Sequence, residues 1–158
     1  AQVGRQLADT ISSTRRLHVV HAEPVAIADG PLEPAAPTGG STVSVAGVRF
    51  TYPGRSQPAL SDVRFDVPAG ATVALVGPSG AGKTTIANLL LRFWDPDSGA
   101  ILLDGVDLRQ LTLDGLRGRI ALVAQDTYLF NDTLEANVRL ARPDATAEQV
   151  TLALRRAA

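Results

Sequence analysis

The chain has 158 residues, 45% of them hydrophobic, and a formal net charge of −1. This length fits one domain of ordinary size with a buried core, and the small net charge excludes a global field that would attract DNA or an anionic membrane surface. The absence of cysteine excludes disulfides and thiolate metal sites and suits a reducing compartment. No apolar stretch approaches the roughly 18 residues that would indicate a membrane-spanning helix.

The N-terminal region differs in composition from the rest of the chain. Residues 1–21 repeat apolar side chains along one helical face, which predicts a helix. Residues 22–41 are rich in proline, alanine and glycine, which predicts an extended linker that packs poorly. The sequence therefore predicts a helical tail at 1–21, a linker at 22–41 and a working domain at 42–158.

Strand and helix patterns alternate from residue 42 onward. Glycine at position 47 separates two alternating segments that we expect to be short paired strands, and two continuous apolar runs are typical of strands buried on both faces. Strands mixed with crossover helices predict an α/β fold. The predicted strands are 42–46, 48–52, 61–67, 71–76, 100–103 and 120–124, and the predicted helices are 84–93, 113–117, 133–140 and 147–157.

A glycine-rich loop lies between the predicted strand 71–76 and the helix that follows it. It reads G-P-S-G-A-G-K-T and matches the pattern G-x-x-x-x-G-K-[ST]. Glycines let the backbone wrap around phosphate, and the next helix adds unpaired N–H groups and the positive end of its dipole. Lys83, the only lysine, would reach the β- and γ-phosphates, and the Thr84 hydroxyl would bind Mg²⁺. The predicted cofactor-binding residues of this loop are Gly77, Pro78, Ser79, Gly80, Ala81, Gly82, Lys83, Thr84 and Thr85.

The alternative interpretation of the loop is a glycine-rich turn beside an ordinary surface lysine, which the strand-and-helix context argues against.

Four further segments narrow the choice of protein family. Residues 48–53 read V-R-F-T-Y-P, 91–99 read L-R-F-W-D-P-D-S-G, 123–126 read V-A-Q-D, and 129–134 read L-F-N-D-T-L. In this order the segments resemble the nucleotide-binding domain of ABC transporters, particularly exporters that fuse permease and ATPase, over about residues 42–137.

The resemblance implies a P-loop NTPase fold of the ABC type, with a mixed sheet and an antiparallel β subdomain. It implies ATP and Mg²⁺ as cofactors. The implied partners are a transmembrane domain, in the same or another chain, and a second nucleotide-binding domain; no nucleic acid is expected. It also implies a place at the cytoplasmic face of the cell membrane, with residues 1–21 resembling the tail of a last transmembrane helix.

Two further residues receive roles from the resemblance. Tyr52 matches the aromatic A-loop position that stacks on adenine, although it could be a plain strand aromatic beside Phe50. Gln125 matches the glutamine that contacts Mg²⁺, positions the attacking water and senses the transmembrane partner, although it could be a solvated residue at a strand end. Lys83 and Gln125 are thus the candidate catalytic residues, and Thr84 and Gln125 the candidate Mg²⁺ ligands.

Several family motifs are not found after Gln125: the L-S-G-G-Q signature, the second acidic motif, its adjacent glutamate and the switch histidine. We therefore expect residues 42–158 to be the part of the domain that precedes them. The missing glutamate is the general base, a role worth about 10²–10⁴-fold in rate. The intact protein is expected to couple ATP hydrolysis to transport, whereas this chain alone should bind ATP and be nearly inactive. The alternatives are a soluble ABC-type ATPase of DNA maintenance and a non-catalytic nucleotide-binding remnant.

Overall fold

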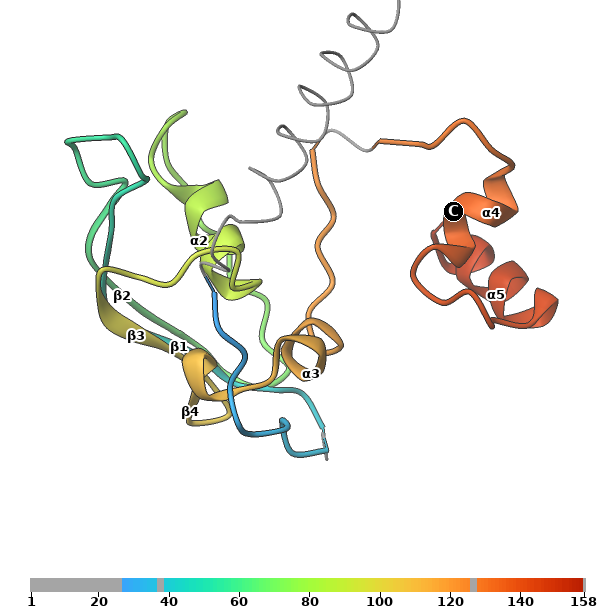
Figure 1. Ribbon diagram of the computed structural model, residues 1–158, viewed down its shortest axis with the longest axis horizontal. Helices are drawn as coiled ribbons and strands as arrows, with labels where there is room; N and C mark the ends of the chain where they lie inside the picture. Colours follow the sequence, from blue (N-terminus) through green and yellow to red (C-terminus); the bar gives the residue numbers. More distant parts are fainter. Residues whose placement is uncertain (1–26, 37–38, 126–127, 158) are drawn as a thin grey trace, which may run out of the picture. The chain divides into compact units, whose positions relative to one another are not determined.

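The computed structural model describes residues 27–36, 39–125 and 128–157. The chain divides into two compact units, Ala1–Ala121 and Leu122–Ala158 (Figure 1). The predicted helix 1–21 and parts of the predicted linker lie outside the described residues. Within the described ranges, no helix combines the length and the hydropathy needed to cross a bilayer.

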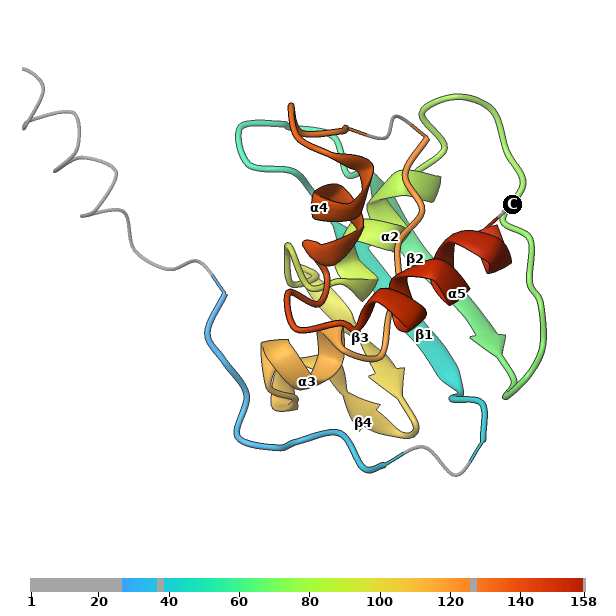
Figure 2. The same cartoon turned by 90° about the vertical axis from the view of Figure 1, so that its right-hand side faces the viewer.

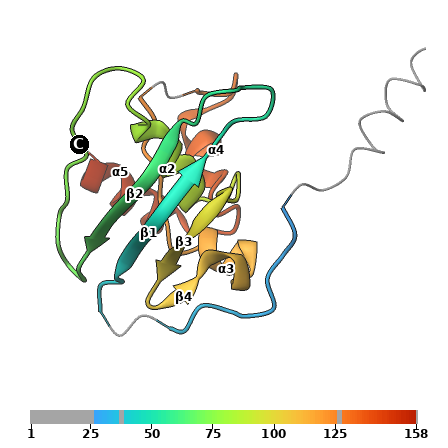
Figure 3. The same cartoon turned by 90° about the vertical axis from the view of Figure 1, so that its left-hand side faces the viewer.

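A four-stranded antiparallel sheet forms the first unit, in the order β2-β1-β3-β4 (Figure 3). Strand β1 pairs with both β2 and β3, and β3 pairs with β4. The strands predicted at 61–67 and 100–103 are thereby confirmed with small shifts of their first residues. The bounds are Val43–Phe50 for β1, Leu60–Val67 for β2, Ser98–Leu103 for β3 and Val106–Asp107 for β4.

The prediction of two strands separated at Gly47 is wrong, because β1 is one strand with a bulge. Its register shifts between Val45 and Val48 against β2, and Gly47 has a φ of +63°. An extra residue in a strand reverses the inward-outward alternation beyond it. The bulge therefore allows Val45 and Val48, three positions apart, both to be buried.

In the described residues of the first unit, two helices and a 3₁₀ turn accompany the sheet: α2 at Lys83–Leu90, η1 at Leu108–Gln110 and α3 at Leu113–Arg117. The helix predicted at 84–93 ends earlier than expected. Arg92 has a φ of +53°, and a residue in the left-handed region terminates a right-handed helix. The predicted helix 113–117 is confirmed.

The core of the first unit lies between the sheet and the helices on one of its faces (Figure 3). All three long strands, α2, η1 and α3 contribute buried apolar side chains. This shared core positions the start of α2 relative to the end of β1. Its buried members are Val45, Val48, Phe50, Leu60, Ile86, Leu89, Ile101, Leu103, Leu108, Leu111 and Leu116.

The two predicted buried strands, 71–76 and 120–124, are wrong for this structure. Figure 2 shows the segment between β2 and α2 as a long loop, and no strand is formed at either run. The exposed fractions of Val76 and Val123 are 93% and 92%. An apolar run becomes a buried strand only when neighbouring strands pair its backbone and both faces are covered, and no described residue of either unit pairs with these runs.

Part of the predicted linker is held firmly against the first unit; we call residues 29–34 the strap. Leu32 donates its backbone N–H to Gln110 O at 2.9 Å and accepts from Thr112 N at 2.8 Å. It also forms a parallel bridge with Leu111. The composition predicted poor packing, but it does not reveal backbone hydrogen bonds, which attach the strap here.

The second unit contains α4, Leu134–Arg139, and α5, Ala147–Ala157. Both confirm predicted helices, and the Thr133 hydroxyl caps α4 by accepting from Ala136 N at 3.0 Å. Among its described residues only Val150 is buried. This unit therefore has little core of its own.

Candidate functional site

The glycine-rich loop leads directly into α2 (Figure 2). Gly80 and Gly82 have φ values of +82° and +88°, a region that L side chains rarely adopt. A Cβ at position 82 would also lie 2.5 Å from Leu60 Cδ2 and 2.9 Å from Ala59 O. Glycine at position 82 is therefore required both by backbone conformation and by the close approach of β2.

Most backbone amides of the loop have no acceptor among the described residues. Ala81 N donates to Pro78 O at 3.2 Å, which tightens the turn. The first N–H groups of a helix lack intrahelical acceptors and carry the positive end of its dipole. Such an array suits an anion with several acceptor oxygens. Within the described part of the chain, no protein acceptor meets the amides of Ser79, Gly80, Gly82, Lys83 and Thr84.

The ammonium group of Lys83 folds back over the loop. Its Nζ donates to Gly77 O and to Pro78 O, both at 2.8 Å. Both carbonyls are neutral, whereas a phosphate oxygen carries negative charge and attracts the ammonium group by Coulomb's law, so a phosphate oxygen would compete well with either carbonyl. Thr84 is exposed, and its hydroxyl has no recorded partner among the described residues.

Tyr52 lies against the helix that begins at the loop. Its hydroxyl donates to Thr85 Oγ1 at 3.2 Å and accepts from Asn88 Nδ2 at 3.3 Å. Its ring meets Phe50 edge-on, with centroids 4.8 Å apart, and Trp94 at 6.1 Å. The structure thus brings together two residues predicted separately, Tyr52 and Thr85. The Thr85 side chain is buried, and its hydroxyl oxygen accepts the hydrogen bond from Tyr52.

Asn88 is a residue of this site that sequence patterns did not predict. It lies three positions after Thr85, so both side chains share one face of α2. That spacing was the available signal, but an amide on a helix does not reveal a tyrosine partner 36 positions earlier in the chain.

Gln125 belongs to the second unit and is exposed. The aspartate that follows it at position 126 lies outside the described residues. The role of Gln125 stays a prediction from the resemblance.

The segment after Gln125 is organised by a single amide side chain. Asn137 Oδ1 accepts from Phe130 N at 2.7 Å, and its Nδ2 donates to Phe130 O at 3.1 Å and to Thr133 O at 2.9 Å. Tyr128 and Phe130 meet edge-on at 5.1 Å and remain exposed. The turn before α4 is therefore held in shape while its aromatic rings face solvent.

The carboxylates with shifted pKa values lie near the β3–β4 turn. The backbone N–H of Thr42, which donates to Asp104 Oδ1 at 2.7 Å, lowers the pKa of Asp104. Burial alone would raise the pKa of Asp107, but hydrogen bonds from Arg109 outweigh burial and lower it. Both shifts are explained by structural hydrogen bonds.

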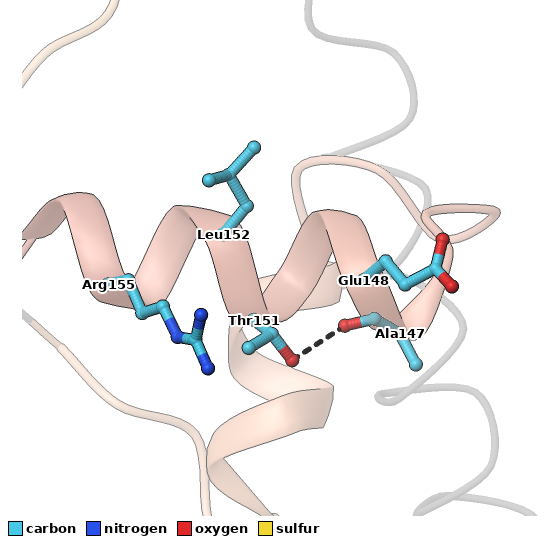
Figure 4. A pocket seen from close by; sticks show the side chains of 5 residues that line it. All are labelled: Ala147, Glu148, Thr151, Leu152 and Arg155. Atoms are coloured by element: carbon cyan, nitrogen blue, oxygen red, sulfur yellow. Dashed lines mark hydrogen bonds between the residues drawn. The ribbon is translucent and has the colours of Figure 1, made fainter.

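A hollow runs along α5 (Figure 4). The lining side chains among the described residues all come from this one helix, and the Thr151 hydroxyl is already used in a bond to Ala147 O at 2.8 Å. Since no other described element brings polar groups to this hollow, it is a weaker candidate than the loop.

The glycine-rich loop and its helix match a known family. A family model described as "ABC transporter" matches residues 60–158. The chain belongs to the ABC transporter family. Membership implies nucleotide binding by this ABC transporter chain and confirms the resemblance seen in the sequence.

Curated relatives of this ABC transporter chain include the "ATP-dependent lipid A-core flippase" of Escherichia coli (strain K12) and of Shigella flexneri. Each is 53% identical over 116 residues, covering 73% of this chain and 20% of the relative. The chain thus spans about a fifth of the length of these relatives.

A solved structure gives the same result for the fold. "Structure of a bacterial Atm1-family ABC exporter with ATP bound" superposes with a TM-score of 0.77 at 38% identity, covering 93% of this chain and 26% of that one. The predicted α/β fold of the P-loop ABC type is confirmed. Both comparisons favour the exporter type over an ATPase of DNA maintenance.

Proposed function

We propose that this ABC transporter domain binds ATP through the loop 77–85, and that the intact protein couples ATP binding and hydrolysis to transport. The observation that carries the proposal is the array of loop amides without protein acceptors, closed by the Lys83 ammonium group. The names of the relatives support ATP as the nucleotide, since one group is ATP-dependent and the solved exporter holds ATP.

Affinity should come mainly from the phosphates. A hydrogen bond to a charged group contributes about 1.5–3 kcal/mol, and the loop offers several such donors. Stacking of a base on an aromatic side chain contributes about 1–3 kcal/mol, and Tyr52 offers one ring. We therefore assign affinity to the loop and preference for adenine to Tyr52.

The exposed Thr84 hydroxyl suits Mg²⁺, which favours a few oxygen ligands together with phosphates and water. Among the described residues no cluster of three or more His, Asp or Glu side chains could hold a metal by itself, so the phosphates would have to complete the site. Bound Mg²⁺ would supply charge neutralisation at the phosphates. Gln125 is proposed as a further ligand and a water-positioning residue on the resemblance alone.

We further propose a transmembrane domain and a second nucleotide-binding domain as partners, at the cytoplasmic face of the membrane. The support is that a flippase and an exporter are among the similar proteins. Hydrolysis is proposed for the intact protein, while this chain alone should bind ATP and turn it over slowly.

Replacement of Lys83 by alanine tests the phosphate assignment. Losing one charge-assisted bond of about 1.5–3 kcal/mol should weaken ATP binding about ten- to a hundredfold. The measurement is isothermal titration with MgATP. Arg64→Ala is a matched control, because it also removes one positive charge but from an exposed surface pair with Asp62. Unchanged affinity in Lys83→Ala would refute the assignment.

A further inference from the structure

The Tyr52 hydroxyl is bonded to two residues of one helix. Thr85 and Asn88 stand one turn apart on α2 and share a face, and they bond the hydroxyl at 3.2 and 3.3 Å. Helix α2 begins at Lys83, and its first turn forms part of the glycine-rich loop. The hydroxyl therefore links the aromatic ring to the element that carries the phosphate site.

Both sides of this link are packed against neighbouring side chains. Helix α2 is anchored in the core by Ile86 and Leu89, and Thr85 itself is only 6% exposed. On the other side, the Tyr52 ring meets Phe50 at an interplanar angle of 79°, in the edge-to-face arrangement that aromatic pairs favour. The ring is therefore held by ring contacts on one side and by hydroxyl bonds on the other.

We propose that Thr85 and Asn88 are positioning residues, which set the spacing between the base-stacking ring of Tyr52 and the phosphate loop. The inference rests on the proposed function, in which Tyr52 stacks on adenine. A ring already ordered before the nucleotide arrives loses little conformational entropy on binding. The hydroxyl, and not only the ring, would then contribute to recognition of adenine nucleotides.

Loss of the positioning bonds should weaken the binding only of ligands that carry a base. Tyr52→Phe keeps the ring but removes both hydrogen bonds, and Asn88→Ala removes one of them. Because the freed ring must be ordered during binding, each change should weaken ATP binding about three- to tenfold. Inorganic tripolyphosphate has no base, so its affinity should stay the same in both variants.

The experiment measures MgATP and magnesium tripolyphosphate binding to the whole 158-residue chain by isothermal titration. The variants are Tyr52→Phe, Asn88→Ala, the double variant and Tyr52→Ala, with exposed Asn131→Ala as the matched amide control. The double variant should bind ATP no more weakly than Tyr52→Phe, since both changes break the same link. Asn131→Ala should match the wild type.

The outcomes separate the two proposals. If Tyr52→Phe binds ATP like the wild type while Tyr52→Ala does not, the positioning role is refuted and ATP binding stands. If Tyr52→Phe loses both ligands equally, the hydroxyl maintains the loop itself, which also refutes the positioning role. If the wild-type chain binds neither ligand, the proposed function fails. If Asn88→Ala does not fold, the comparison of Tyr52→Phe with the wild type tests the positioning role by itself.

Discussion

At the scale of single residues, the site depends on a few atoms with defined partners. Gly82 needs a left-handed backbone and has no room for a Cβ beside Leu60. Lys83 holds the loop closed through bonds to two carbonyls, which we propose that phosphate oxygens replace. The Tyr52 hydroxyl links the end of β1 to α2. Each of these contacts is local in space, but only the lysine contacts are local in sequence.

Asp104 provides a prediction about pH at this scale. The Thr42 N–H lowers its pKa in the folded chain, so its ionised form stabilises the fold above the unfolded value of about 3.9. That contribution is lost as pH falls below this value and through the lower folded pKa. Asn tolerates the φ of +51° at this position but carries no charge.

Asp104→Asn should therefore be less stable than the wild type at pH 7, and the difference should shrink at pH 3. Urea unfolding at both pH values measures it. An equal difference at the two pH values would contradict the assigned hydrogen bond.

At the scale of elements, backbone hydrogen bonds explain two features that composition did not predict, the attached strap and the bulge in β1. The strap reads as a loose linker, yet Gly30 N donates to Leu111 O at 3.1 Å, and Asp29 accepts from Leu113 N at 2.6 Å. In β1 the bulge at Gly47 shifts the register, so that Val45 before it and Val48 after it both face the core. In both cases the partner lies far away in sequence.

Gly30→Ala should detach the strap. A Cβ there would lie 2.3 Å from Gln110 C, and backbone atoms cannot move aside cheaply. We expect a loss of about 0.5–3 kcal/mol in unfolding free energy, with faster amide exchange at positions 30 and 32. Gly39→Ala is the matched control, because nothing lies within 4 Å of its Cβ position. Equal unfolding free energies of the two variants would show that attachment of the strap does not stabilise the first unit.

At the scale of the whole chain, the two units differ in how much apolar surface they bury. The first has a core drawn from strands and helices, whereas only Val150 is buried among the described residues of the second. Apolar residues of both runs once predicted as strands are instead exposed, Val76 and Val123 almost completely. Exposed apolar runs of this kind favour association.

We therefore expect the purified 158-residue chain to self-associate. A Val76→Asp, Val123→Asp double variant should shift it toward monomer at little cost in stability, since both side chains are exposed. Size-exclusion chromatography with light scattering, over a range of concentrations, measures the change. A monodisperse wild-type monomer with cooperative two-state unfolding would contradict the expectation.

The sequence by itself determined the phosphate-loop motif, the family, the helices α2 to α5 and the strands β2 and β3, because these depend on local spacing, periodicity and turn chemistry. It predicted strands at 71–76 and 120–124 from their apolar composition, and there it was wrong, since a strand needs a partner that composition cannot supply. Only the tertiary structure showed the bulge in β1, the attached strap, and Asn88 beside Tyr52. Those features are contacts between residues far apart in the chain, and local patterns do not encode which distant groups will meet.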